Sequence, residues 1–188
     1  GSGRHTRQLS STVRSAQREI VIQTPYLILS RRGAAFFRQI RRQAPGVKVI
    51  VSTNSMGSTD NLLAYSANVR QRELFVHDLG FEVYEYYPQP ADLDRVLPHF
   101  DELQIRDHKE EPFLSLHGKS IVVDDLTTYI GTFNLDPRSE NLNTEGGLVI
   151  RDPVIAHLVK SEVLRDIRPG NSWAMAPILS SDMAALTS

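Results

Sequence analysis

The strand that decides the fold class reads EIVIQT over residues 19–24 and ends at Pro25. An apolar run of this length is typical of a short buried β-strand. Residues 33–43 then carry apolar side chains at helical spacing, and residues 47–51, VKVIV, form a β-branched run after a Pro-Gly turn. Strand, helix and strand in this order predict a right-handed crossover between parallel strands.

Beyond this unit the alternation continues and then changes character. Residues 61–79 indicate a helix that ends at Gly80, and residues 81–86 alternate like a strand. Residues 88–113 are charged and interrupted by prolines, which is typical of a functional or disordered loop. Closely spaced β signals and a last helix follow, in order, at residues 114–116, 120–124, 127–130, 146–150 and 153–164. We therefore expect an α/β fold with a mixed, largely parallel central sheet flanked by helices on both faces.

Length and composition favour a globular protein with one main domain. The chain has 188 residues, of which 40% are hydrophobic, and a formal net charge of −1, which excludes a globally basic nucleic-acid binder. It has no cysteine, so disulfides and thiolate metal sites are excluded. No apolar run approaches the ~20 residues needed to span a bilayer.

The first residues, Gly-Ser-Gly without an initiator methionine, are typical of a remnant left by expression cloning. We expect the native N-terminus to be missing, so a targeting segment or a preceding domain is left open. We divide the chain into the remnant and lead-in at residues 1–14, a catalytic domain at 15–175 and a C-terminal tail at 176–188.

Four residues near the middle of the chain carry side chains that suit a phosphoryl group. His117 and Lys119 are two apart, so on a strand they face the same way, and Thr132 and Asn134 repeat this arrangement after Gly131. An imidazole, a cation, a hydroxyl and an amide on one face supply a nucleophile and donors for phosphate oxygens. The spacing therefore predicts phosphoryl-transfer chemistry.

Asp124 lies seven residues after His117, so on an unbroken strand it faces the opposite way. We expect its carboxylate to bind backbone amides or a basic group and to play a structural part, away from substrate. A metal site built from His99, Asp101, Asp107 and His108 is disfavoured because their spacing is irregular.

Residues 117–134 match every position of H-x-K-x4-D-x6-G-[ST]-x-N, the motif of the phospholipase D superfamily, and the chain resembles that family. The resemblance implies that His117 attacks phosphorus and forms a phosphohistidine, while Lys119 and Asn134 hold the phosphate, with Thr132 beside them. It implies that Glu145 orients His117, that Asp124 and Gly131 are structural, and that no metal or cofactor is needed.

Three further stretches are similar to the C-terminal half of bacterial cardiolipin synthases: Thr24-Pro25-Tyr26, the polar run over residues 52–60, and residues 134–145. Gly118 departs from that branch, which more often has another small residue there. The resemblance implies a phospholipid substrate and a peripheral location on the cytoplasmic face of a bacterial inner membrane. Arg138 becomes a candidate contact for a lipid phosphate or head group.

The superfamily works with two such motifs that face each other, and this chain has one, since no other histidine is followed two residues later by lysine. It therefore supplies one half-site, completed by an N-terminal half of the same protein or by a homodimer partner. The predicted function is phosphatidyl transfer or phospholipase D-type hydrolysis. The alternatives are a homodimeric single-motif phosphodiesterase or nuclease, although nucleic acid is disfavoured by the charge, and a non-catalytic half that binds phospho-ligands.

A basic run at the start and along one face of the helix at 33–43 has two interpretations. It is a solvated surface, or it attracts anionic lipid. Its members are Arg31, Arg32, Arg38, Arg41 and Arg42.

Overall fold

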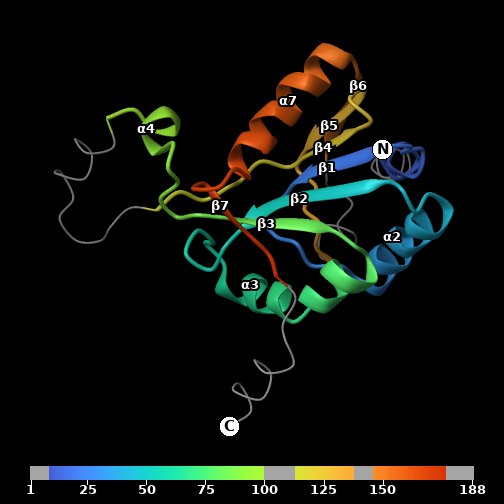
Figure 1. Ribbon diagram of the computed structural model, residues 1–188, viewed down its shortest axis with the longest axis horizontal. Coiled ribbons are helices and arrows are strands. Elements are labelled where there is room, and N and C mark those ends of the chain that lie inside the picture. Colours follow the sequence, from blue (N-terminus) through green and yellow to red (C-terminus); the bar gives the residue numbers. More distant parts are fainter. Residues whose placement is uncertain (1–8, 100–112, 138–145, 177–188) are drawn as a thin grey trace, which may run out of the picture.

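A computed structural model of the chain describes residues 9–99, 113–137 and 146–176, and its centre is a seven-stranded sheet in the order β6-β5-β4-β1-β2-β3-β7 (Figure 1). The elements, in chain order, are β1 (Glu19–Gln23), α2 (Arg31–Gln43), β2 (Lys48–Asn54), α3 (Leu62–Val69), the π-helix η1 (Leu74–Asp78), β3 (Glu82–Tyr86), α4 (Leu93–Val96), β4 (Ser120–Val123), β5 (Thr127–Gly131), β6 (Gly147–Arg151), α7 (Pro153–Asp166) and β7 (Ser172–Ala174).

The sheet is mixed, as expected, but parallel pairing is confined to its centre. β1 pairs with β2 and β2 with β3 in parallel, whereas β4 joins β1 from the other side in an antiparallel pair. β5 and β6 extend that side, and β7 closes the opposite edge beside β3, all antiparallel. Parallel pairing covers less of the sheet than expected. β4 and β5 are joined by a short turn, which only antiparallel strands allow, and β7 returns antiparallel to β3.

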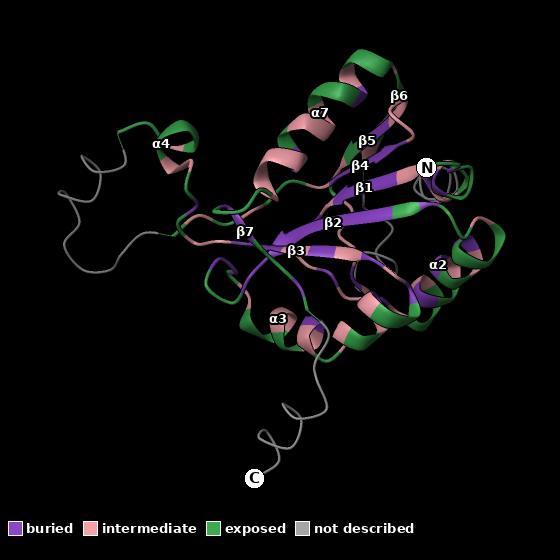
Figure 2. Ribbon diagram, viewed as in Figure 1, coloured by how far each residue is buried: buried purple, intermediate pink, exposed green. Residues whose placement is uncertain are grey.

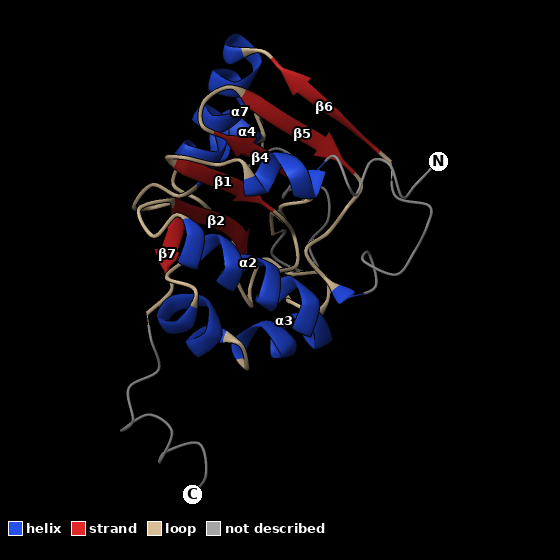
Figure 3. Cartoon of the chain, turned by 90° about the vertical axis from the view of Figure 1, so that its right-hand side faces the viewer, coloured by secondary structure: helices blue, strands red, loops and turns tan. Residues whose placement is uncertain are grey.

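Helices cover both faces of this sheet, with α7 on one face and α2 and α3 on the other (Figures 1 and 3). The alternation along β1 explains why its whole run is apolar. Ile20 and Ile22 join the large core under α2, whereas Val21 joins a smaller core under α7. Figure 2 shows the resulting band of buried residues along the central strands.

The helix predicted over residues 61–79 is divided into two parts. α3 begins after Asn61, whose side chain caps it by accepting from the amide of Ala64. The π-helix η1 follows, and the turn ends at Gly80, whose φ of 64° favours glycine. The helical region therefore ends at Gly80, as predicted, but it is not the single continuous helix that the sequence indicated.

Both ends of the described chain contribute to the fold. Residues 9–14 are helical, and Leu9 and Val13 are buried in the large core. Trp173 lies on β7, which pairs with β3, and its ring packs against Tyr87 at 4.0 Å between centroids. Among the described residues, none of the helices is both long and apolar enough to cross a membrane.

Candidate active site

His117 and Lys119 lie in residues 113–119, which form no strand and lead directly into β4. The strand predicted over residues 114–116 is therefore wrong. His117 is exposed and Lys119 is half-buried, with its Nζ donating to the carbonyl oxygen of His117 at 2.9 Å. The carbonyl oxygen of Lys119 accepts from the amide of Gly131 at 3.1 Å. Pairing of β4 with β5 thus brings the first half of the motif beside the second.

The segment before His117 is held by a side chain that sequence reasoning did not single out, that of Asn54 at the end of β2. Its Oδ1 accepts from the amide of Leu116 at 2.8 Å, and its Nδ2 donates to the carbonyl of Leu116 at 2.9 Å. Asn54 is 2% exposed, so this amide replaces a missing strand partner in the interior. The only sequence signal was its place in the polar run after a strand.

Thr132 and Asn134 follow β5 along a segment that runs beside residues 24–28. The Thr132 hydroxyl accepts from the amide of Gly146 at 3.0 Å and donates to its carbonyl at 3.2 Å. The carbonyl of Leu135 accepts from the amide of Ile28 at 2.7 Å, and the two segments form a parallel bridge. Asn134 therefore follows a fixed backbone path from β5.

Gly131 is required by close packing at the end of β5. A Cβ at this position would lie 2.3 Å from the hydroxyl of Tyr129 and 2.5 Å from the carbonyl oxygen of Gly146. Such contacts would force the strands apart. Close approach of the neighbouring backbone therefore accounts for a glycine at this position of the motif.

Gly118, the departure from the resembled branch, makes room for Gln23. A Cβ on Gly118 would lie 2.3 Å from Gln23 Oε1, and Gln23 Nε2 donates to Asp166 Oδ2 at 2.7 Å. Burial raises the pKa of Asp166 to about 6; the Gln23 bond opposes this and the nearby carboxylates Asp92 and Glu162 add to it. Gln23 therefore connects a titratable carboxyl to the backbone between His117 and Lys119.

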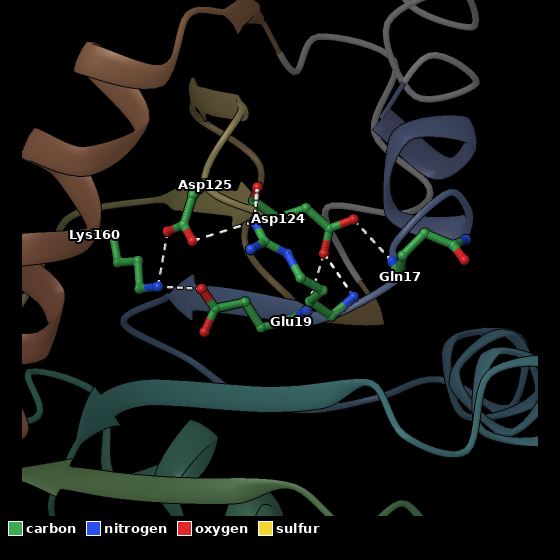
Figure 4. A network of polar contacts seen from close by, with 6 residues as sticks. Gln17, Glu19, Asp124, Asp125 and Lys160 are labelled. Atoms are coloured by element: carbon green, nitrogen blue, oxygen red, sulfur yellow. Dashed lines mark hydrogen bonds and ion pairs between the residues drawn. The ribbon is translucent and has the colours of Figure 1, made fainter.

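Asp124 meets its geometric expectation, because its carboxylate binds backbone amides (Figure 4). Oδ2 accepts from the amide of Gln17 at 2.8 Å, and Oδ1 accepts from the amides of Arg18 at 2.8 Å and Glu19 at 3.0 Å. Burial raises the pKa of Asp124, but these amides outweigh it, so the pKa lies below its usual value. The carboxylate ties the turn after β4 to the start of β1.

The neighbouring Asp125 belongs to an ion-pair cluster with α7. Lys160 Nζ donates to Asp125 Oδ1 at 2.7 Å and also to Glu19, as Figure 4 shows. The bond from Lys160 lowers the pKa of Asp125, against the effect of burial. Both aspartates of this turn have positive φ, 53° and 56°, so the polar contacts offset a strained backbone.

Tyr26, in the Thr-Pro-Tyr run, donates its hydroxyl to Asp60 at 2.6 Å. Burial and this bond raise its pKa to about 12, so the hydroxyl keeps its proton at neutral pH. Of the basic run, Arg38 pairs with Asp78 at 3.0 Å and Arg41 packs over Gly80. Those two arginines therefore have local partners.

Several predicted residues lie outside the described residues: Glu145, Arg138, Asp101, Asp107 and His108. The convergence of His117, Lys119, Thr132 and Asn134 on one pocket, with Glu145 at the His117 ring, stays a prediction. Within the described ranges, His, Asp and Glu side chains form no group of three or more that could hold a metal ion.

Comparison with known proteins places these features in a family. Residues 9–167 match the family model described as "Cardiolipin synthase, PLD-like domain". The chain belongs to this phospholipase D-like family. It is 32% identical over 152 residues to cardiolipin synthase C of Escherichia coli, covering 80% of this chain and 30% of that protein. An uncharacterised Helicobacter pylori protein is 32% identical over 148 residues, which cover 79% of this chain and 27% of its own length.

Solved structures of the phospholipase D family share the fold. NucT from Helicobacter pylori has a TM-score of 0.65 at 14% identity and covers 92% of each chain. Nuc from Salmonella typhimurium, a phospholipase D family member, has a TM-score of 0.61 at 18% identity and covers 90% of each chain. Phosphatidylserine synthase of Haemophilus influenzae has a TM-score of 0.60, with 90% of this chain covering 36% of that one. The predicted superfamily and fold class are confirmed, and phosphodiester transfer in general is the chemistry that this family supports.

Proposed function

We propose that this chain is one half-site of a phospholipase D-type phosphatidyltransferase or phospholipase, with His117 as the reactive histidine. The observation that carries the proposal is the contact between the two motif halves. The pairing of β4 with β5 joins Lys119 to Gly131, directly before Thr132 and Asn134, in a chain that matches a PLD-like family model. Exposure of His117 is consistent with access to a substrate.

The chemistry proceeds in two balanced steps. A His117 ring nitrogen attacks phosphorus, the bond to the leaving alkoxide breaks, and a histidine of the opposite half-site protonates that alkoxide. An acceptor alcohol or water then gives its proton to the second histidine and attacks phosphorus, which releases His117. Lys119, Thr132 and Asn134 stabilise the phosphate oxygens, and Glu145 holds the His117 ring.

A second half-site is needed because one histidine has no acid to protonate the leaving group. The surface next to the motif strand supports such a partner. Ile130 and Leu148 are cross-strand partners on β5 and β6, and they are 44% and 68% exposed. We propose that an N-terminal half of the same protein, or a second copy, completes the site. The chain spans less than a third of the length of cardiolipin synthase C and of the Helicobacter pylori relative it matches, so the activity of a whole protein belongs to this proposal.

The substrate we propose is a phospholipid at the cytoplasmic face of a bacterial inner membrane, with Arg138 as a phosphate or head-group contact and with residues 15–175 as the catalytic domain. The relatives named as cardiolipin synthases support this choice. The second candidate is a homodimeric single-motif phosphodiesterase. It is supported by the fold match to NucT and Nuc, in which one copy of this fold accounts for 92% and 90% of the chain.

A turnover assay on phosphatidylglycerol vesicles tests the proposal. The chain alone at monomeric concentration should be poorly active, and addition of an N-terminal half or enforced dimerisation should restore turnover that His117→Ala abolishes. Robust His117-dependent turnover by the monomer would overturn the half-site arrangement. His117-dependent cleavage of a soluble phosphodiester, with no turnover of lipid in any pairing, would favour the second candidate.

A further inference from the structure

A cavity of about 350 Å³ opens on the α2 side of the sheet, within the size range of small-molecule sites. Its walls come from the helical residues 9–14, the start of α2 and strand β4, which contributes Ile121. Phe133 and Leu135, from the segment after β5, complete the lining. The cavity therefore borders the motif without containing the four side chains assigned to phosphate.

Most of the lining is apolar and aromatic. Leu29 and Phe37 are almost fully buried, and Phe36 packs edge-on against Phe37 with 5.4 Å between the ring centroids. Ordered water needs two to four polar partners, which walls of this kind supply poorly. The space suits an apolar ligand better than a polar one.

Two arginines stand at the edge of this apolar space. Arg14 and Arg32 both line the cavity and are exposed, and the Arg14 guanidinium lies 5.1 Å from the centre of the Phe36 ring. Arg31 and Arg32 fill the first turn of α2, which has no acidic residue. The helix dipole disfavours cations at that end, so this placement works against local stability and suits a nearby anion.

The position of the cavity links it to the motif. Phe133 and Leu135 lie on either side of Asn134 in the chain, and both line the cavity. The backbone at Leu135 is fixed by its bonds to Ile28 and Thr24. A ligand in the cavity would therefore pack against the segment that carries Asn134.

We propose that this cavity binds one acyl chain of an anionic phospholipid, with Arg14 and Arg32 at its mouth facing the negatively charged head group. The inference rests on the proposed function, because it assigns the acyl chain of the same lipid substrate. Apolar walls hold the chain, and the two cations select the charge of the lipid that carries it.

Calorimetric titration of the 188-residue chain with single-chain lipids below their micelle concentrations tests the assignment. The probes are phosphatidylglycerol with one myristoyl chain, phosphatidylcholine with the same chain, and glycerophosphoglycerol, which has no chain. We expect the anionic lipid to bind roughly tenfold tighter than the zwitterionic one, because two exposed arginines would pair with its net negative head group. The probe without a chain should show no saturable binding.

Variants locate the site. Gly33 lines the cavity on α2, so Gly33→Leu should fill it while raising helix propensity, and affinity for both single-chain lipids should fall by roughly tenfold or more. Ser10→Leu fills the same space from the helical residues 9–14, so it provides an independent test if Gly33→Leu does not fold. Ala35→Leu, at an exposed position of α2 outside the lining, is the matched control and should bind as the unmodified chain does.

The charge arm uses Arg14→Gln with Arg32→Gln, which should remove the preference for the anionic lipid. Arg31→Gln, in the same helical turn but outside the lining, should keep most of it. Equal binding by the filled variants and the unmodified chain would overturn the proposal. The proposal would also be overturned if the unmodified chain bound none of the lipids and Gly33→Leu changed its oligomeric state, because the cavity would then be a protein interface.

Failure of this inference is distinguishable from failure of the proposed function. Lipid turnover by the assembled enzyme that Gly33→Leu and Ser10→Leu leave unchanged would overturn the acyl-chain site and leave the reaction standing. Saturable lipid binding that both variants abolish, with no turnover in any pairing, would support the site and overturn the reaction.

Discussion

The two ends of the motif that runs from His117 to Asp124 are held in opposite ways. Asp124 is bound by three backbone amides from the start of β1, and Asp125 beside it pairs with Lys160 of α7. His117 is exposed, in a segment without strand pairing that Asn54 holds at Leu116. One end is built into the sheet and the other lies at its margin.

This difference indicates that one residue of a motif can serve the stability of the fold while another residue of the same motif serves its activity. A carboxylate that accepts from three backbone amides contributes to folding, since its removal leaves those donors without their protein acceptor. An exposed imidazole contributes little to folding and is free to react. Within the eight residues 117–124, we therefore expect substitutions at one end to affect activity and substitutions at the other end to affect stability.

The largest effect is expected at the reactive end. His117→Ala should lower turnover by the proposed two-half enzyme by about 10³-fold or more, because the proposed nucleophile is lost. Its melting temperature should stay within experimental error, since the side chain is exposed. Turnover assays and calorimetry measure the two. His157→Ala, at an exposed histidine on α7, is the control, and a large loss of stability in His117→Ala would contradict the comparison.

At the structural end the result should be reversed. Asp124→Ala should lower the free energy of unfolding by about 2–4 kcal/mol, because three amides lose a charged acceptor. Asp124→Asn should cost less, since it keeps one acceptor oxygen. Urea unfolding measures both, with Asp94→Ala on the exposed α4 as control. Loss of turnover in Asp124→Ala well below its melting temperature, in a folded protein, would show that Asp124 has a part in the chemistry.

Asn54 binds the backbone next to His117 from the interior of the fold, so its replacement should lower both stability and turnover. Asn54→Ala leaves the amide and carbonyl of Leu116 without their side-chain partner and should cost about 1–3 kcal/mol of unfolding free energy. Because Leu116 precedes His117, turnover should also fall, by roughly tenfold. Urea unfolding and kcat of the same preparation give both numbers. Unchanged kcat would mean that the segment 113–119 is positioned by other contacts.

The smallest effect is in the pH dependence of stability, and its sign should differ between the two ends. The lowered pKa of Asp124 stabilises the fold above its unfolded pKa, and this is lost as the pH falls through the folded pKa. Asp166, behind Gly118, has a raised pKa of about 6, so the folded state holds a proton that the unfolded state releases near pH 4. Raising the pH through that window should lower the free energy of unfolding.

Asp166→Asn tests this sign directly. We expect the variant to gain about 1–2 kcal/mol relative to the unmodified protein as the pH rises from about 4 to about 7, after allowance for partial solvent exposure. Urea unfolding at several pH values measures the difference. A constant difference across that range would show that Asp166 titrates normally.

Local patterns were enough for much of the fold. The apolar runs at residues 19–24 and 47–51 lie in β1 and β2, and the last helix begins at Pro153, as predicted; the side chain of Asp152 caps it. The strand predicted at 114–116 was wrong, because the backbone of Leu116 binds the side chain of Asn54 and the amide of Leu114 binds the carbonyl of Pro88, in place of a neighbouring strand. Alternating apolar residues indicate burial of one face, and burial does not specify which group supplies the hydrogen bonds.

The sequence by itself determined the family motif and named the candidate residues, because the motif is defined by spacing within one segment. The facing argument for Asp124 assumed an unbroken strand, whereas residues 113–119 form no strand and Asp124 lies in the turn after β4. Only the tertiary structure decided what those residues contact. Gln17 and Asp124 are 107 positions apart, Asn54 and Leu116 are 62 apart, and the cavity combines residues from the helical region 9–14, α2 and the segment after β5. Such contacts depend on how the elements pack, and packing is set by shape and register across the whole core, which no local pattern records.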